Sequence, residues 1–353
     1  MANLFKKLSF RNKDVKIFQN YKIWFFIPVI VLFISLLLGT IYQFSPRFDR
    51  FANIGIDFQG GTVLNVEMRG ADMNQDNYDK NLAYITEIVE AKGINISVHQ
   101  SSGNHAIIVR YTNIVNGEDF NIDAKTSEMN AINNSIGLEI EEKLKEVYGN
   151  NVEVETTSSL TGATASSRLI RTAFLSVGIA MILILGYIII RFDLFSGIGA
   201  ITALVHDVII MIALTIAFRI QINSSFIACI ITIVAYSINN TIVIFDRVRD
   251  NIAPYLSNNK RIDPKEIINS SVSATMNRSI YTTLTTVITV SMLAILGVPA
   301  IQEFALPILF GLFAGFFSSV FIAPSVWGIL QQMKIDKERK AKIERMKSKN
   351  TKS

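Results

Sequence analysis

Uninterrupted runs of apolar residues dominate the chain, and six of them are long enough to cross a membrane. A transmembrane helix needs roughly 20 mainly apolar residues to span about 30 Å of hydrocarbon. The qualifying stretches cover residues 23–44, 169–190, 196–218, 224–245, 280–298 and 304–330. The first is too long for the apolar region of a signal peptide, and residues 41–46 lack a small-residue cleavage pattern, so we expect an uncleaved anchor. The pattern predicts an α-helical integral membrane protein with six transmembrane helices.

Between the first and second stretches, the hydrophobic period switches between that of a strand and that of a helix. Strands are expected at 62–67, 95–100, 106–111 and 152–156, and helices at 79–92 and 128–148. The resulting order, β-α-β-β-α-β, is that of the split βαβ or ferredoxin-like unit. We therefore expect a ferredoxin-like α+β (βαββαβ) domain between spans 1 and 2.

Charge is distributed unevenly between this domain and the rest of the chain. Residues 46–168 hold 10 Lys/Arg and 18 Asp/Glu, whereas the remaining residues hold 24 Lys/Arg and 11 Asp/Glu. Basic residues precede the first span, follow the fourth and fill the tail, and positively charged flanks stay in the cytoplasm. Both termini are therefore expected to be cytoplasmic, and the acidic domain is expected to be exported.

The spans and charges together predict the domain organisation. In chain order it comprises a basic cytoplasmic N-terminus at 1–22, a first transmembrane helix at 23–45, an exported domain at 46–168, a five-helix bundle at 169–330 with a cytoplasmic loop at 247–278, and a basic cytoplasmic tail at 331–353. Within that loop, Asp263 and Pro264 suit the N-cap and first position of a short amphipathic helix. Pro307 and Pro324 predict kinks or local breaks in the last span.

Composition narrows the function classes. Half of the residues are hydrophobic, 18% are charged, and the single cysteine, Cys229, allows neither an internal disulfide nor a cysteine metal cluster. The sequence has no nucleophile elbow, His-Glu-x-x-His or nucleotide-binding loop, so we expect no enzyme, catalytic residue, metal or cofactor. The Lys-rich tail suits anionic lipid or nucleic acid, and we favour a membrane-surface anchor without nucleic acid.

A glycine-rich motif, Gly-Ile-Asp-Phe-Gln-Gly-Gly-Thr at 55–62, directly follows the first span. Glycines permit tight turns and positive φ angles where a chain enters a folded domain. A phosphate-cradling loop is the alternative, but no Lys-Ser/Thr pair follows and the segment is expected outside the cytoplasm. We therefore favour a structural junction, formed by Gly55, Asp57, Gly60, Gly61 and Thr62.

His206 and Asp207 lie near the middle of the third span. A carboxylate at the bilayer centre costs roughly 3 kcal/mol on insertion scales. Asp207 is therefore expected to be protonated, to pair with Arg278 or to belong to a proton relay. A buried hydrogen-bonded pair that fixes helix packing is an equal alternative.

The fourth span turns polar and runs into a charged segment at 235–251. Its intramembrane polar residues are Ser237, Asn239, Asn240 and Thr241. Each needs a protein partner, because hydrocarbon offers none. Arg278 and Thr282 begin a polar face on the fifth span. Hydroxyls can bond back to their own helix, so a packing face stays possible, but three polar helices in one bundle favour a hydrated pathway.

Taken in order, several motifs resemble those of the SecD/SecF family of bacterial protein-export membrane proteins, within the resistance-nodulation-division transporter superfamily. The resemblance rests on residues 55–62, Ala-Leu-Val-His-Asp at 203–207, 235–251 with its Asp246-Arg247 pair, Thr-Met-Asn-Arg-Ser at 275–279 and the small residues within 304–324. It extends over roughly 51–327, and one set of six spans fits the smaller, SecF-type members.

The resemblance implies a transport function in the bacterial inner membrane. SecF-type members pair with SecD to complete a twelve-span unit beside the SecYEG channel, with YajC and YidC as further expected partners. Inward proton flow is expected to move the periplasmic domains, which pull or retain the translocating polypeptide, while membrane lipids surround the spans. Arg278 matches the family's functional arginine, whereas Asn240 replaces the family's proton-linked aspartate.

That replacement keeps several functional hypotheses open. A carboxamide does not release a proton at any relevant pH, so protonation falls to Asp207 and to carboxylates of SecD, or coupling is weakened. A half-transporter for small molecules or lipids would need a second repeat, and the chain holds one set of spans. A membrane scaffold that moves no protons is favoured by Asn240 and opposed by Asp207 and Arg278.

Overall fold

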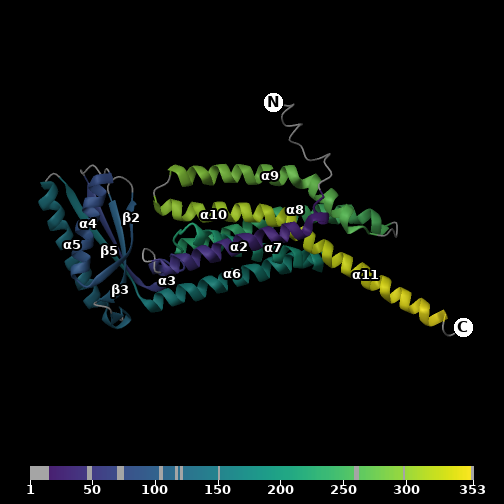
Figure 1. Cartoon of the computed structure of the whole chain (residues 1–353), viewed down its shortest axis with the longest axis horizontal. Coiled ribbons are helices and arrows are strands. Elements are labelled where there is room, and N and C mark those ends of the chain that lie inside the picture. The colour runs from purple at the N-terminus through teal and green to yellow at the C-terminus, as the bar shows by residue number, and fades with distance from the viewer. Residues whose placement is uncertain are drawn as a thin grey trace, which may run out of the picture.

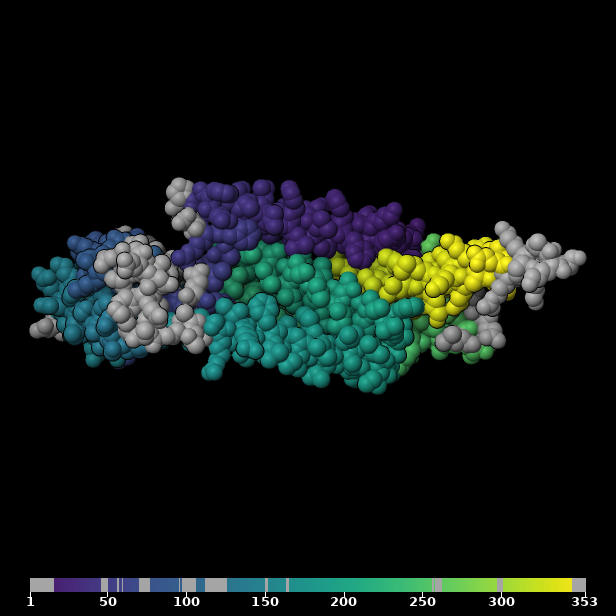
Figure 2. All heavy atoms as spheres, turned by 90° about the horizontal axis from the view of Figure 1, so that it is seen from below, coloured from purple at the N-terminus to yellow at the C-terminus, as the bar shows by residue number. Residues whose placement is uncertain are grey.

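The protein consists of a helical bundle with a smaller α/β domain at one end and a projecting C-terminal helix at the other (Figures 1 and 2). The computed structural model describes residues 16–45, 50–69, 75–102, 106–115, 118–119, 122–149, 152–257, 262–296 and 299–350. Most of the expected basic N-terminus, at 1–15, therefore lies outside the described residues.

The α/β domain is a layer of helices on an antiparallel sheet. Its elements are β1 (Gly61–Arg69), α4 (Gln75–Ala91), β2 (Ile94–Ser102), β3 (Ala106–Val115), β4 (Glu118–Asp119), α5 (Ile122–Tyr148) and β5 (Glu153–Thr161). The strand order is β2-β3-β1-β5, every pair is antiparallel, and the two-residue β4 pairs with β3. The predicted βαββαβ order and the ferredoxin-like fold class are thus confirmed.

Alternation along β1 builds the core of this domain. Leu64, Val66 and Met68 are buried and pack with apolar residues of α4 and α5, such as Ile85 and Ile140. Successive strand side chains point to opposite faces, so the residues between them lie on the other face. Figure 1 shows α4 and α5 on the side of the sheet away from the bundle.

One buried amide fixes α5 against the sheet. Asn133 is 1% exposed; its Oδ1 accepts a hydrogen bond from the Tyr111 hydroxyl at 2.7 Å, and its Nδ2 donates to Thr62 Oγ1 at 3.3 Å. Burial raises the pKa of Tyr111 above its ordinary value, so the phenol keeps its proton and remains a donor.

In the part of the chain that the structure describes, six helices are long and apolar enough to span a membrane, as the sequence predicts. These spans are Phe18–Phe44, Ala165–Arg191, Leu194–Ala217, Ser224–Tyr255, Pro264–Leu296 and Ile301–Glu344. They are built from η1 (Phe18–Asn20), α2 (Tyr21–Phe44), α6 (Ala163–Arg191), α7 (Leu194–Ala217), α8 (Ser224–Ser257), α9 (Pro264–Leu296), α10 (Pro299–Phe317), the π-helix η3 (Ser318–Ile322) and α11 (Ala323–Asn350). A short helix, α3 (Ile56–Gln59), precedes β1.

The spans divide into an interior group and a peripheral group. In the apolar window of the last span 61% of residues are buried, and the values for α7 and α8 are 44% and 39%. In contrast, the value is 6% for α6 and 11% for α2 and for α9. Figure 2 shows α2 (purple) and α6 (teal) along opposite edges of the visible face. The bundle is therefore organised around α7, α8 and the α10–η3–α11 span.

The expected loop at 247–278 needs correction, because it is helical over most of its length. α8 continues to Ser257 and α9 already begins at Pro264. Asp263 Oδ1 accepts from the Lys265 backbone N–H at 2.9 Å, so the cap is where the sequence places it, but the helix is 33 residues long rather than short. Buried apolar residues such as Val248 and Ile268 continue beyond the predicted spans, and their packing keeps both segments helical.

The two prolines of the last span behave differently. Pro307 lies inside α10, which continues unbroken to Phe317. Pro324 lies two residues after the end of the π-helix Ser318–Ile322, and this confirms the predicted local break. Pro324 has no N–H to donate to the carbonyl four residues earlier, and the helix widens just before it.

Two glycines of α10, Gly311 and Gly315, allow this helix to lie very close to α8. A Cβ on Gly311 would lie 2.4 Å from Ile233 Cγ1, and one on Gly315 would lie 3.0 Å from Ser237 Cβ. Small residues are the usual means by which membrane helices approach each other closely. The interior of the bundle therefore depends on these glycines.

We expect Gly311→Ala to destabilise the protein by about 1–3 kcal/mol, because the added methyl group overpacks the α8–α10 contact. Gly186→Ala is the matched control, since a Cβ on Gly186 of α6 would meet nothing within 4 Å. Thermal unfolding of the full chain in detergent measures both. Equal unfolding temperatures for the two variants would contradict the close packing.

Candidate functional site

Asp207 lies on α7 with 0% of its surface exposed. Its Oδ1 is 2.9 Å from His206 Nδ1, and the Ser237 hydroxyl on α8 donates to Oδ2 at 2.5 Å. Ser318 of η3 lies beside the carboxyl as well, and its hydroxyl donates to the Gly315 carbonyl oxygen at 3.3 Å. A Cβ on Gly315 would lie 3.5 Å from Oδ2, so the absence of a side chain there lets the backbone of α10 lie close to the carboxyl. The carboxyl thus occupies the junction of α7, α8, α10 and η3.

His206 can exchange a proton with this carboxyl. Its side chain is 11% exposed, its ring stacks on Phe317 with centroids 5.9 Å apart, and its Nε2 is buried with no partner in the described part of the chain. A neutral imidazole can donate through Nδ1 to the carboxylate, or accept through Nδ1 from the protonated acid. The His206–Asp207 contact is therefore compatible with either form of the carboxyl.

Further hydroxyls join α8 to η3 beside the carboxyl. Thr241 Oγ1 lies 2.9 Å from Ser319 Oγ, and both lie 3.3 Å from the Ser237 carbonyl oxygen. Ser318 and Ser319 are both fully buried although they are adjacent in sequence. The π-helical turn, with its wider spacing, lets both face the interior. Together these residues form a polar cluster: His206, Asp207, Ser237, Thr241, Ser318 and Ser319.

Asn240 is buried too, but it belongs to a separate contact between α8 and α9. Its Nδ2 donates to Thr283 Oγ1 at 3.4 Å, and its Oδ1 accepts from Thr282 Oγ1 at 3.5 Å. No hydrogen bond joins Asn240 to Asp207 among the residues described. Asn239 is exposed on α8, so the predicted polar run divides between three surroundings.

Arg278 is exposed on α9, and its carbonyl oxygen accepts from Thr282 Oγ1 at 2.9 Å. Within the described residues it makes no ion pair with Asp207, whose partners are instead His206 and the serines. The expected Asp207–Arg278 pair is therefore corrected. The two residues lie on helices that are separated by α8 and α10, which both contact α9.

Asp246 and Arg247 lie on α8 near the end away from the α/β domain. The Asp246 carboxylate is 2.8 Å from Arg249 and 3.6 Å from Arg191, the last residue of α6. Arg247 is exposed. The contact with Arg191 connects the end of α6 to α8, and both contacts lie outside the polar cluster.

The predicted glycine-rich junction is attached to the turn between α7 and α8. The backbone of Gly55 donates to the Ile222 carbonyl oxygen at 2.8 Å. A Cβ on Gly55 would lie 3.1 Å from that same oxygen, so glycine permits the close approach. Asp57 Oδ2 accepts from the Ser224 backbone N–H at 2.9 Å and from its hydroxyl at 2.6 Å, and so caps α8.

The chain then enters the sheet through Gly60 and Gly61, whose φ angles are 77° and 153°. Side chains rarely adopt such backbone conformations, which explains the two glycines. Thr62 follows in β1, where it is fully buried. The motif thus occupies the connection between membrane bundle and α/β domain.

The structure also shows an ion pair at this connection that the sequence analysis does not identify. Arg110 of β3 lies 3.5 Å from Glu303 of α10, and both side chains are mostly buried. Asn223 Nδ2 also donates to Glu303 at 3.0 Å. The available signal in the sequence is that Glu303 is the one charged residue in the mainly apolar α10. Its partner is distant in sequence and could not be inferred.

Metal binding finds no support in the described residues, where no group of three or more His, Cys, Asp or Glu side chains is arranged to hold an ion. What the polar cluster offers chemically is a single protonatable carboxyl with an imidazole beside it. Such intramembrane ionisable groups mark ion pathways and proton relays in transporters.

Comparison with known proteins identifies a family. The model for the C-terminal region of the protein export membrane protein SecD/SecF matches residues 139–333. The chain is similar to the protein translocase subunit SecF of Borreliella burgdorferi, with 32% identity over 84% of this chain and 92% of that protein. It is similar to the Calditerrivibrio nitroreducens subunit with 31% identity, over 94% and 98%.

Solved structures agree on the fold. The crystal structure of SecDF from Thermus thermophilus matches with a TM-score of 0.66 and 24% identity, and a SecDF structure in a super-membrane-facing form matches with 0.61 and 22%. The matches cover 91% and 94% of this chain but only 39% and 40% of those chains. From the family model and the relatives together, the chain belongs to the SecD/SecF family of protein-export membrane proteins, as a multi-pass protein translocase subunit of the SecF type.

Proposed function

We propose that this subunit uses inward proton flow to assist protein export, and that Asp207 carries the proton on this subunit. The observation that supports it is a fully buried carboxyl held by His206, Ser237 and Ser318 where three interior helices meet. A carboxyl at this position is costly to insert, and groups kept at that cost are commonly functional. The role is transport, without an enzymatic reaction.

The chemistry at Asp207 is a change of hydrogen-bond partners. As a carboxylate, Asp207 accepts from Ser237 and His206, with the Ser318 hydroxyl beside it. As an acid, it has a proton to donate and one fewer strong acceptor, so the donors around it must rearrange. Ser237 belongs to α8 and Ser318 to η3, so each proton transfer alters how these two elements are held against α7.

Helix α10 offers a route from this change to the α/β domain. Gly315 packs against Asp207 and Ser237, and Glu303, 12 residues earlier on α10, pairs with Arg110 of the sheet. Twelve residues of helix span about 18 Å. A rigid helix that contacts the carboxyl at one place and the domain at another can couple them mechanically.

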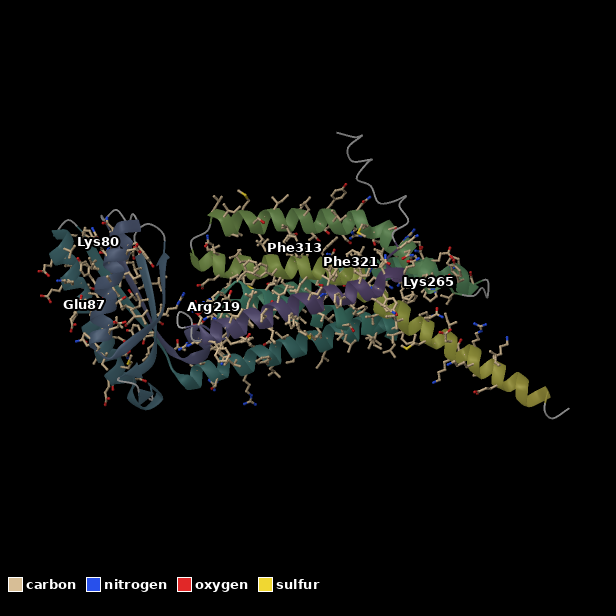
Figure 3. All side chains as sticks on the ribbon, in the orientation of Figure 1. Lys80, Glu87, Arg219, Lys265, Phe313 and Phe321 are labelled. Atoms are coloured by element: carbon tan, nitrogen blue, oxygen red, sulfur yellow. The ribbon has the colours of Figure 1, made fainter. Side chains whose placement is uncertain are left out.

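Orientation and partners belong to the same proposal. Both termini lie in the cytoplasm and the α/β domain lies in the periplasm of a bacterial inner membrane, as the charge asymmetry supports. Figure 3 marks the two ends of the bundle, with Arg219 next to the α/β domain and Lys265 at the far end. The basic tail then contacts cytoplasmic lipid headgroups.

A SecD-type subunit is the proposed direct partner. Few residues of α2, α6 and α9 are buried, so these helices leave apolar side chains exposed. The solved SecDF chains are about two and a half times as long as the part that this chain matches. SecD would cover such faces, and the SecYEG channel, YajC, YidC and the translocating polypeptide are further proposed partners.

A scaffold without proton coupling is the second candidate. Asn240 supports it, because its amide hydrogen bonds with Thr282 and Thr283 and cannot carry a proton. The two functions differ in whether export depends on a protonatable group at Asp207.

We expect Asp207→Asn to remove the part of export that depends on the proton gradient, with a decrease of about tenfold or more. The carboxamide keeps the size of the side chain but has no proton to exchange. Export of a preprotein into inverted membrane vesicles, with and without an imposed proton gradient, measures the effect. Asp250→Asn, the same change at an exposed position of α8, is the control. Gradient-dependent export equal to that of the unchanged protein would favour the scaffold.

Breaking the Arg110–Glu303 pair should uncouple export from proton movement. Arg110→Gln and Glu303→Gln are expected to lower gradient-dependent export by about three- to tenfold while proton flux continues, because Asp207 is untouched. Arg69→Gln, an exposed arginine on β1, is the control. The double variant should be no worse than either single one. Unchanged export, or an equal loss of proton flux, would exclude α10 as the coupling element.

A further inference from the structure

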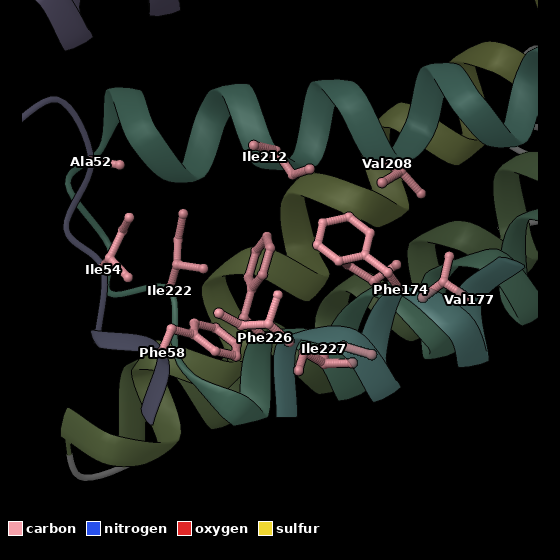
Figure 4. Close-up of a pocket in the computed structure, with 13 residues that line it drawn as sticks. Ala52, Ile54, Phe58, Phe174, Val177, Val208, Ile212, Ile222, Phe226 and Ile227 are labelled. Carbon is pink, nitrogen blue, oxygen red and sulfur yellow. The ribbon is translucent and has the colours of Figure 1, made fainter. Parts of the chain in front are cut away.

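A cavity of about 430 Å³ lies between the peripheral helix α6 and the bundle interior, at the end next to the α/β domain (Figure 4). Every side chain that lines it is Ala, Val, Ile or Phe. They come from α6 (Phe174, Val177), α7 (Val208, Ile212), α8 (Phe226) and the strand-like segment at Ile54. Its volume is within the range of about 300–1,000 Å³ usual for small-molecule sites.

This cavity exists because α6 packs loosely. A Cβ on Gly178 would meet nothing within 4 Å, in contrast to the glycines of α10. Phe174 lines the cavity and is nevertheless 78% exposed, so the cavity opens towards the surface that faces the bilayer. A helix that stands away from its neighbours leaves room for something other than protein.

The chemistry of the lining excludes water and favours hydrocarbon. A stable buried water needs two to four polar partners, and none of the lining side chains has one to offer. The lining residues of α6 extend from Ile170 to Val177, about 10 Å along the helix at 1.5 Å per residue. That length fits within one leaflet, whose hydrocarbon is about 15 Å thick.

Two arginines lie close to the lining residues along α6. Arg171 is three residues before Phe174 and is its neighbour on the helix surface, and Arg168 lies about one further turn towards the α/β domain. Both arginines are exposed, and neither forms an ion pair with another described residue. The neighbouring carboxylate, Asp57, is already engaged by Ser224. Arginine binds phosphate with two parallel hydrogen bonds, which favours an anionic phospholipid headgroup.

We propose that the cavity binds one anionic phospholipid from the leaflet on the side of the α/β domain. One acyl chain fills the space between α6, α7 and α8, and the phosphate is held by Arg168 and Arg171. The lipid supplies the packing that α6 lacks. It also contacts Val208, the neighbour of Asp207, so the site borders the polar cluster without sharing a residue with it.

Native mass spectrometry of the full chain, titrated with phosphatidylglycerol, tests the acyl part. Val177→Trp and Ile212→Trp fill the cavity and are each expected to lower retention of one phosphatidylglycerol by about tenfold. Leu183→Trp is the matched control, since Leu183 lies on α6, is 68% exposed and does not line the cavity. Retention that survives both filling variants, or that falls equally in the control, would overturn the proposal.

The test of the headgroup contact uses two exposed positions. Arg168→Gln combined with Arg171→Gln is expected to reduce the preference for phosphatidylglycerol over phosphatidylcholine by about tenfold. Arg191→Gln, at the other end of α6, should leave that preference unchanged. An unaltered preference in the double variant would overturn the headgroup assignment. Loss of the lipid from the chain copurified with its SecD-type partner would show that a partner helix fills the cavity, and would overturn the proposal.

Discussion

A carboxyl group withdrawn from water requires hydrogen-bond partners on every side, and the interior of this bundle is arranged around that requirement at Asp207. Its partners come from three places in the chain: His206 beside it, Ser237 on α8 and Ser318 on η3. Bringing these segments together demands that α8 and α10 nearly touch, which the glycines of α10 permit. The π-helical turn before Pro324 then presents adjacent serines to the same interior.

The rest of the molecule can be understood from this centre outwards. The interior helices are closely packed and polar where they meet, whereas α2, α6 and α9 expose apolar surface. We propose different complements for these outer helices: partner helices for some faces and, on α6, a lipid. Helix α10 connects the centre to the α/β domain through Glu303 and Arg110. We propose that a change of protonation at Asp207 reaches the sheet along this path.

Sequence reasoning succeeded where a feature depends on local periodicity. The six spans, the βαββαβ order and the break at Pro324 all follow from residues that are close together in the chain, and each is confirmed. Asp207 was recognisable because an acid within an apolar run is costly. The cap at Asp263 follows from neighbouring residues, whereas the length of the surrounding helices does not, because tertiary packing of Val248 and Ile268 extends them beyond the apolar spans.

Features that depend on contacts between distant segments were not predictable. Ser318 and Ser319 belong to the small residues of the last span, and only the π-helical turn makes both of them neighbours of the Asp207 site. Asn240 lies on the same helix as Ser237, yet it contacts the threonines of α9. The Arg110–Glu303 pair joins residues almost two hundred positions apart, at a connection whose geometry is set by the whole fold.

Proton flux tests the central claim most directly. The chain, reconstituted with its SecD-type partner in vesicles, is given an imposed pH gradient, and a trapped pH-sensitive dye records proton entry. We expect flux above that of empty vesicles, with loss of most of it on Asp207→Asn and retention on Asp250→Asn. Flux that is absent from the unchanged complex, or that is the same with and without the Asp207 carboxyl, would contradict the account.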